Sequence, residues 1–529
     1  MTETNVQPET QTGATQPGEF QRRAAELNDL LCVINVLTWD ARTQMPGGGS
    51  GSRAQQLATL STLARERLLD PAFEAAARQI GPGDDLQERA ASQALEAVAA
   101  MGRVPEALTR ELALLKSEAQ DAWAAAKQNN DFAAFEPALT RMVALTRQLA
   151  EALGYAASES GGHPYDALLN TYEPGLTVKT LLPLFERLRT HHLPLMRAIQ
   201  AQPAPRSDFL TRSYPPDAQK TFSLAAAERF GYDTTRGRLD QSAHPFEISF
   251  TREDVRITTR FQENFLPGAL FGTLHETGHA LYEQGVNPEL SRTVLTSDLL
   301  GLYAVGGASY GTHESQSRLW ENRIGRSAAY WKLHYKELQS TFPDGLADVT
   351  LEEFLRSVNR VTPSLIRVEA DELTYDLHIM LRVDLEMRLI AGELEVKDLP
   401  AAWNARIKED LGLEVPDDAH GVLQDIHWSS GMFGSFPTYT IGNVMASQFY
   451  NAAGRAIPDL EAQLERGEYA PLRAWLTDNI YTHGRTYTPH ELLVRTTGEG
   501  LNPQPYLDYL TGKYSGLYSL EAPEQKEHV

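Results

Sequence analysis

The chain has 529 residues, of which 42% are hydrophobic and 22% are charged, and its formal net charge is −22. This length allows one large buried core, and no change in composition divides the sequence into separate halves. An acidic surface repels phosphate backbones and anionic lipids, so we expect no nucleic-acid partner and no membrane partner. No run of 18 apolar residues predicts a transmembrane helix.

The ends of the chain differ in character from the rest. Residues 1–18 have no basic segment followed by an apolar one, so no secretory signal is predicted there. We predict one folded domain over 19–515, between a disordered tail at 1–18 and a solvated tail at 516–529. The single cysteine, Cys32, excludes an intrachain disulfide and fits the reducing cytoplasm. Its apolar surroundings in the sequence favour a buried, inert thiol over a nucleophile.

Residues 20–155 have a helical pattern almost throughout, because apolar residues recur at spacings of three and four. Glycine and proline interrupt this pattern in three places, at 46–52, 80–85 and 103–107. We therefore predict a lobe of long antiparallel helices. Two further helices are predicted, at 178–200 and 215–231.

The pattern changes at 242–261, where apolar and polar residues alternate. The alternation runs from Phe246 to Phe250 and again from Val255 to Ile257, with the residues TRED between the two runs. A period of two is typical of strands with one buried face. The sequence therefore predicts a short β-hairpin directly before the next helix.

That helix contains the sequence HETGH, with His275, Glu276 and His279. Residues four apart project from the same face of a helix, so the two imidazoles can bind one ion while Glu276 acts on a water at that ion. Zinc lowers the pKa of its water to about 7 and polarises a carbonyl group. Among 14 histidines an HExxH sequence also arises by chance, but the helical context favours a hydrolytic metal site.

Three segments follow that bear on this site. Residues 312–326 are predicted to be a helix, and 364–392 one long apolar helix that crosses the core. Residues 425–443 are rich in glycine and aromatic residues, as in a loop that shapes a site. A zinc site needs a third protein ligand, and Glu314 is our candidate. Its position alone does not distinguish it from a surface glutamate.

Six motifs occur along the chain: HPF (244–246), DVRITTR (254–260), HETGH (275–279), HESQSRLWEN (313–322), IRVEADELTY (366–375) and HWSSGMFGSFPTYTIGN (427–443). Together, and in this order, they resemble the carboxypeptidase Taq family of metallocarboxypeptidases, over about residues 20–510. The resemblance implies a mainly α fold, a saddle of long helices around a deep groove that is similar to neurolysin and angiotensin-converting enzyme. It also implies a homodimer.

The resemblance implies an activity as well: removal of C-terminal residues, with broad specificity, from peptides that have a free C-terminus. It makes Glu314 the third metal ligand beside His275 and His279. The implied ion is Zn²⁺, and Co²⁺ fits the same two nitrogens and one oxygen. One departure is the segment 286–312, which looks longer than the family's and would alter the rim of the groove.

An exopeptidase must hold a free α-carboxylate, which a guanidinium binds through two parallel hydrogen bonds. The resemblance associates Arg367 with this role and Tyr439 with it as a partner. His427 and His244 are weaker candidates, as donors to the oxyanion of the transition state. Both histidines fit a structural role nearly as well.

Other interpretations stay open at this point. Arg367 could form an internal ion pair with Glu369 or Asp371, and Tyr439 could be a core residue. The same fold hosts endo-acting oligopeptidases, which do not need Arg367. A catalytically silent peptide-binding protein could keep a structural metal, but it would have no use for Glu276.

Overall fold

The structure is a computed structural model that describes residues 18–155 and 162–520. The predicted tail at 1–18 lies outside the described residues except for Gly18, and so do residues 521–529 of the predicted tail at 516–529. The last helix continues to Tyr518, three residues beyond the predicted end of the domain. None of the helices in these ranges combines the length and the apolar character needed to cross a membrane.

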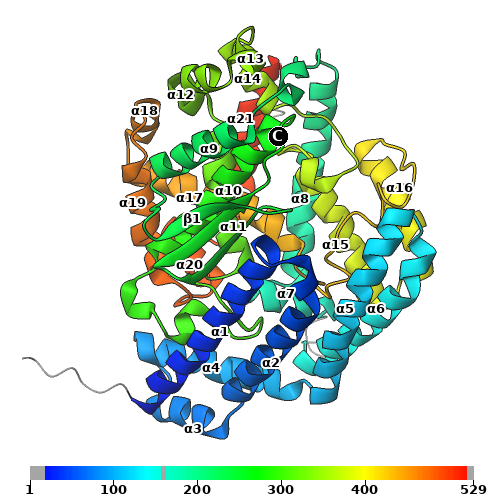
Figure 1. The fold of residues 1–529 in the computed structure, drawn as a ribbon, viewed down its shortest axis with the longest axis vertical. Helices are drawn as coiled ribbons and strands as arrows, with labels where there is room; N and C mark the ends of the chain where they lie inside the picture. The colour runs from blue at the N-terminus through cyan, green and yellow to red at the C-terminus, as the bar shows by residue number, and fades with distance from the viewer. Residues whose placement is uncertain (1–17, 156–161, 521–529) are drawn as a thin grey trace, which may run out of the picture.

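The first six helices form the lobe at the bottom and right of Figure 1. They are α1 (Glu19–Thr43), α2 (Ser50–Leu68), α3 (Pro71–Ile80), α4 (Leu86–Arg103), α5 (Glu106–Asn129) and α6 (Phe132–Leu153). Their starts follow local chemistry: the carboxylate of Asp85 accepts the backbone N–H of Glu88 at 2.9 Å, which caps α4. The predicted breaks at 80–85 and 103–107 are confirmed, whereas the break at 46–52 is shorter because α2 already begins at Ser50.

A small sheet crosses the middle of the molecule (Figure 1). Strands β2 (Phe246–Thr251) and β3 (Asp254–Thr259) pair antiparallel, so the predicted hairpin is confirmed. The third strand, β1 (Gly237–Gln241), pairs parallel with β3 and was not predicted. Its sequence GRLDQ contains one apolar residue and therefore shows no alternation. A separate two-stranded pair, β4 (Ser297–Asp298) with β5 (Tyr303–Ala304), lies in the segment 286–312.

The remaining helices build the body around this sheet. They are α7 (Tyr165–Tyr172), α8 (Val178–Gln200), α9 (Pro216–Phe230), α10 (Leu266–Gly285), α11 (Tyr310–Arg318), α12 (Ala328–Thr341), α13 (Pro343–Leu346), α14 (Leu351–Val358), α15 (Tyr375–Ala391), α16 (Leu399–Leu411), α17 (Pro437–Ala456), α18 (Leu460–Glu465), α19 (Ala470–Asn479), α20 (Pro489–Thr497) and α21 (Gln504–Tyr518). The mainly α fold with a small sheet is confirmed, as are the helices at 178–200 and 215–231.

Two predicted segments differ from the structure. The predicted helix at 364–392 is wrong over 364–374, because the carboxylate of Asp371 accepts backbone N–H groups of Leu373 and Thr374 and holds a turn instead. The helix begins only at Tyr375. The predicted loop at 425–443 ends at Phe436, since Pro437 starts α17.

The predicted helix at 312–326 consists of two parts. The α-helix α11 ends at Arg318, and a π-helix follows over Leu319–Gly325. Such wide turns are frequent at functional sites. Here the π-helix directly follows α11, the helix that contains the predicted metal ligand Glu314.

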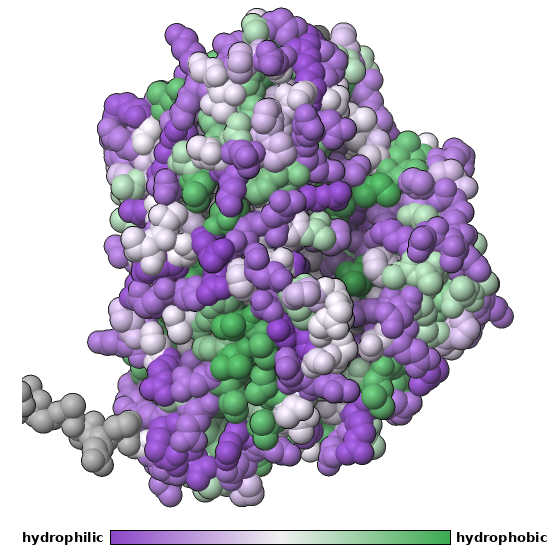
Figure 2. Space-filling model, viewed as in Figure 1, coloured by the Kyte–Doolittle hydropathy of each residue, from purple (hydrophilic) through white to green (hydrophobic). Residues whose placement is uncertain are grey.

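The segment 286–304 joins the first lobe to the body. Its apolar residues, including Leu290 and Leu295, belong to one buried cluster with α1, α3 and α4. The segment thus holds the lobe against the end of α10. Figure 2 shows the visible face hollowed between the end of α1 and the helices α5, α15 and α16, which can be located in Figure 1.

Candidate metal centre

Helices α10 and α11 approach each other closely at the middle of the HETGH sequence. A Cβ atom at Gly278 would lie 2.3 Å from the carbonyl oxygen of Gln316 on α11, so only glycine fits. A third helix approaches α11 in the same way, because a Cβ at Gly442 of α17 would lie 2.6 Å from Cγ of Glu314. These two glycines let Glu314 reach the histidines of α10.

The side chains of His275, His279 and Glu314 converge at this contact. Their ligand atoms all lie within 4.8 Å of one another. Oε2 of Glu314 is 3.6 Å from Nε2 of His275 and 3.3 Å from Nε2 of His279. Two imidazole nitrogens and one carboxylate oxygen that face a common point fit a divalent ion with a fourth position left open. The structure thus brings together the three residues predicted as metal ligands.

The second ring nitrogen, Nδ1, of both His275 and His279 also has a partner. Nδ1 of His275 lies 2.9 Å from Oε2 of Glu321, which is in the π-helix. Nδ1 of His279 lies 2.5 Å from Nδ1 of His313, and Nε2 of His313 lies 2.9 Å from Oε1 of Glu283. These contacts fix the ring orientations and leave both Nε2 atoms free to bind an ion.

Sequence reasoning did not assign roles to Glu321, His313 and Glu283. Glu321 follows Glu314 by seven residues, and Glu283 follows His279 by four, so both share a helix face with a predicted ligand. His313 directly precedes Glu314. This spacing could have identified the two carboxylates from the sequence. The contact between His279 and His313 could not be predicted in this way, because it depends on how α10 packs against α11.

Burial shifts the pKa values of two residues in the site, Glu276 and His279. Burial, helped by the nearby carboxylate of Glu314, raises the pKa of Glu276 to about 7 against the opposing positive charges of His275 and Arg42. Burial, together with the neighbouring His313, lowers the pKa of His279 to about 3. Among the described residues no side-chain hydrogen bond reaches the carboxyl group of Glu276, so its oxygens are available to a reacting molecule.

Arg367 lies in an internal ion pair whose partner was not predicted. Its Nη2 atom lies 2.7 Å from Oδ1 of Asp425, not from Glu369 or Asp371, and its Nη1 donates to the hydroxyl of Tyr375 at 2.7 Å. Arg382 pairs with the other oxygen of the same Asp425 at 2.6 Å. Two buried cations thus share one carboxylate.

The other predicted substrate-binding residues lie in two places. The hydroxyl of Tyr439 lies 3.1 Å from Nε2 of His427, and Cζ of Arg367 is 5.3 Å from the Tyr439 ring, so these three residues are neighbours. Burial, followed by the charge of Arg367, lowers the pKa of His427 to about 3 and keeps its imidazole neutral. His244 is exposed, in the loop before β2, and its side chain has no hydrogen bond to these three residues.

A helical body in which two histidines of one helix, a glutamate of the next and a buried glutamate converge is characteristic of metal-dependent peptidases with an HExxH helix. Comparison with known proteins agrees with this class. Residues 19–514 match the family described as Carboxypeptidase Taq (M32) metallopeptidase. The chain belongs to this family, and it is a metallocarboxypeptidase.

Individual relatives cover nearly the whole chain. Thermostable carboxypeptidase 1 of Thermus thermophilus is 41% identical over 512 residues, which are 94% of this chain and 98% of the relative. Carboxypeptidase 1 of Bacillus subtilis is 39% identical over 92% of this chain and 96% of its own. Among solved structures, the M32 carboxypeptidase from Deinococcus radiodurans R1 is 41% identical, with a TM-score of 0.89 over 95% of this chain and 99% of that one.

Proposed function

We propose that His275, His279 and Glu314 hold a zinc ion and that Glu276 is the general base and acid of a broad-specificity carboxypeptidase. The observation that carries this proposal is the convergence of the three ligand atoms within 4.8 Å. The adjacent Glu276 is buried, and its carboxyl group has no hydrogen-bond partner among the described residues. The donor set of two nitrogens and one oxygen suits zinc, with cobalt as a substitute.

A bound ion of this kind supplies an activated water and polarises the carbonyl of the scissile bond. The carboxylate of Glu276 takes the proton of the attacking water and then delivers it to the nitrogen of the leaving amino acid. A buried carboxyl with a pKa near neutral suits both steps, because it accepts and releases a proton near the operating pH.

Arg367 is our proposed ligand for the substrate's terminal carboxylate, with Tyr439 and His427 beside it. A guanidinium has five N–H donors, and three of those in Arg367 go to Asp425 and Tyr375. Two donors remain for a substrate. The pair of Arg367 and Arg382 carries one more positive charge than Asp425 neutralises, which favours a bound carboxylate. We assign His244 a lesser role, as a polar contact to the peptide.

The oligomeric state and the location are also proposals. The family resemblance supports a homodimer, and the single half-buried Cys32 fits a cytoplasmic protein. Light scattering on the purified protein would measure twice 58.7 kDa for the dimer. A value of one chain would contradict it.

The deciding experiment follows one peptide by mass spectrometry, with a free or an amidated C-terminus. The native protein should shorten the free peptide one residue at a time, and a chelator should stop the reaction. Glu276→Gln should keep the metal, because Glu276 is not a ligand, and lose nearly all turnover. Internal cleavage of the amidated peptide would instead identify an endo-acting oligopeptidase, and metal binding without any cleavage a silent peptide-binding protein.

A further inference from the structure

Arg318 connects the proposed metal centre to a second group of residues. It is the last residue of α11, four positions after Glu314, so the two side chains share a face of the helix. Its Nε atom donates to Oε1 of Glu314 at 2.7 Å, whereas the other oxygen, Oε2, faces the two histidines. Arg318 thereby fixes which oxygen of Glu314 is turned towards the proposed ion.

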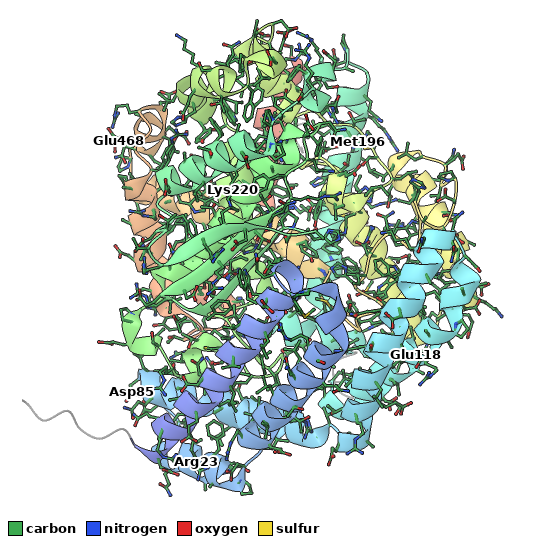
Figure 3. All side chains as sticks on the ribbon, in the orientation of Figure 1. Arg23, Asp85, Glu118, Met196, Lys220 and Glu468 are labelled. Atoms are coloured by element: carbon green, nitrogen blue, oxygen red, sulfur yellow. The ribbon has the colours of Figure 1, made fainter. Side chains whose placement is uncertain are left out.

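The same guanidinium lies over an aromatic ring of another helix. Cζ of Arg318 is 4.5 Å from the centroid of the ring of Tyr375, the first residue of α15. Only 14% of the Arg318 side chain and 7% of Tyr375 are exposed, and a cation–π contact is stronger where water is excluded. Figure 3 labels Glu118 and Glu468 towards opposite edges of the molecule, and α11 and α15 lie between them in the same view (Figure 1). The contact therefore joins two helices of the interior.

The hydroxyl of Tyr375 contacts the proposed carboxylate ligand. It accepts a hydrogen bond from Nη1 of Arg367 at 2.7 Å, while Nε and Nη2 of Arg367 donate to Asp425. The backbone N–H of Tyr375 donates to the carbonyl oxygen of Asp371 at 2.9 Å, so the turn at Asp371 holds the start of α15 in place. Tyr375 thus contacts Arg318 through its ring and Arg367 through its hydroxyl.

These contacts form one continuous chain that begins at Glu314 and ends at Arg367. A carboxypeptidase cuts the last peptide bond, so its metal and its carboxylate ligand must lie a fixed distance apart. A misplacement of about 1 Å can lower a rate about 100-fold. Glu314 lies on α11 and Arg367 lies before α15, so their separation depends on contacts between these two parts of the chain.

We propose that Arg318 and Tyr375 are positioning residues that fix the separation between the metal ligand Glu314 and the carboxylate ligand Arg367. This inference rests on the proposed function. Each of the two residues acts through its neighbour and needs no contact with the peptide. A change at Arg318, beside the metal, should therefore weaken the binding of a free C-terminus at Arg367.

The test measures equilibrium binding of one peptide, with a free or an amidated C-terminus, to Glu276→Gln protein saturated with zinc. Adding Tyr375→Phe keeps the ring under Arg318 but removes the acceptor of Arg367. The preference for the free peptide should fall about 10-fold, in the range of a hydrogen bond to a charged group. Zinc affinity, measured by competition with a chelating dye, should stay native. In the active protein the same change should raise KM for the free peptide more than it lowers kcat.

Arg318→Gln tests the connection from the other end. It should lower zinc affinity about 10- to 100-fold, because Glu314 loses its charged partner. With zinc saturating, the preference for the free peptide should fall as well, and Arg318→Lys, which keeps a cation for both contacts, should retain most of it. Arg318→Gln combined with Tyr375→Phe should lose no more preference than Tyr375→Phe alone, because both changes break the same chain.

Arg323→Gln is the matched control. Arg323 lies in the adjacent π-helix, and its Cζ is 4.1 Å from the rings of both Tyr450 and Tyr509. Its replacement also removes a stacked guanidinium, so it should lower the midpoint of thermal unfolding but change neither zinc affinity nor the preference for the free peptide.

Three results would overturn the inference: a native preference in Tyr375→Phe, a native preference in zinc-saturated Arg318→Gln, or losses that multiply in the double variant. Tyr375→Phe is the more conservative change, and it decides alone if Arg318→Gln does not fold. If the native protein cleaves nothing, the proposed function fails, whereas the dissociation constants of the two peptides still decide the role of Tyr375. Equal binding of the free and amidated peptides to Glu276→Gln would overturn both.

Discussion

Nδ1 of His313 lies 2.5 Å from Nδ1 of His279, and its other nitrogen lies 2.9 Å from Glu283. His275 is supported differently, because its Nδ1 contacts the carboxylate of Glu321 directly. A carboxylate therefore orients His275 directly, whereas the carboxylate of Glu283 orients His279 through the imidazole ring of His313. Both histidines should depend on these partners for their orientation.

Replacement of His313 tests the longer of these two connections. His313→Phe keeps the stacking on His279 and Tyr282 but removes both hydrogen bonds. Loss of a partner of this kind weakens metal binding about 10- to 100-fold. Competition with a chelating dye should measure this loss of affinity. His334→Phe, a change on α12, is the control, and equal affinities in the two variants would mean that His313 does not orient His279.

Glu321 offers a graded test of the direct connection. Glu321→Gln keeps an oxygen that can accept from His275, although it weakens the pairs with Arg318 and Arg326. Glu321→Ala removes the acceptor altogether. We expect metal affinity to fall in the order native, Gln, Ala, with the alanine variant about 10- to 100-fold weaker than native. An alanine variant with native affinity would contradict this order.

The contact of α10 with α11 should fail when Gly278 gains a side chain. In Gly278→Ala the new Cβ would lie 2.3 Å from the carbonyl oxygen of Gln316, so the two helices must separate and Glu314 must move from the histidines. We expect lower metal content and a lower midpoint of thermal unfolding. Gly454→Ala is the matched control, because nothing lies within 4 Å of its Cβ in α17, and it should stabilise by about 0.5 to 1 kcal/mol. Native metal binding in Gly278→Ala would refute the steric argument.

Cys32 should be unreactive in the folded protein. Burial, with help from the charge of Asp29, raises the pKa of its thiol to about 12, so at pH 8 the thiolate is about 1000-fold rarer than at the ordinary value of 9.0. The thiol lies 2.6 Å from the carbonyl oxygen of Phe250. A thiol reagent at pH 8 should label the unfolded protein in seconds and the folded protein far more slowly. Equal rates would show that the thiol is open to solvent.

The sequence predicted those parts of the site that follow from local periodicity. The HETGH helix and the hairpin over Phe246 to Ile257 each have a pattern that only one kind of element satisfies. The pairing of Arg367 with Asp425 joins positions 58 residues apart, which no periodicity connects. The turn at Asp371 interrupts an apolar, helix-like run, because one carboxylate captures the N–H groups that a helix would need. Local chemistry and distant partners thus account for what the sequence pattern missed.

The last prediction concerns Arg367, our proposed ligand for the terminal carboxylate that an exopeptidase, unlike an endo-acting relative, must bind. Arg367→Lys should lower kcat/KM about 10- to 150-fold, because an ammonium cannot reproduce the planar fork of a guanidinium, and a charge-assisted contact is worth about 1.5 to 3 kcal/mol. Arg382 still neutralises Asp425 in this variant, so folding and metal content should stay close to native. Arg110→Lys, which changes an exposed arginine of α5 that is paired with Glu106, is the control. Native protein should strongly prefer a free over an amidated peptide, and Arg367→Lys should lose that preference; a variant that still discriminates would make Arg367 a structural partner of Asp425 alone.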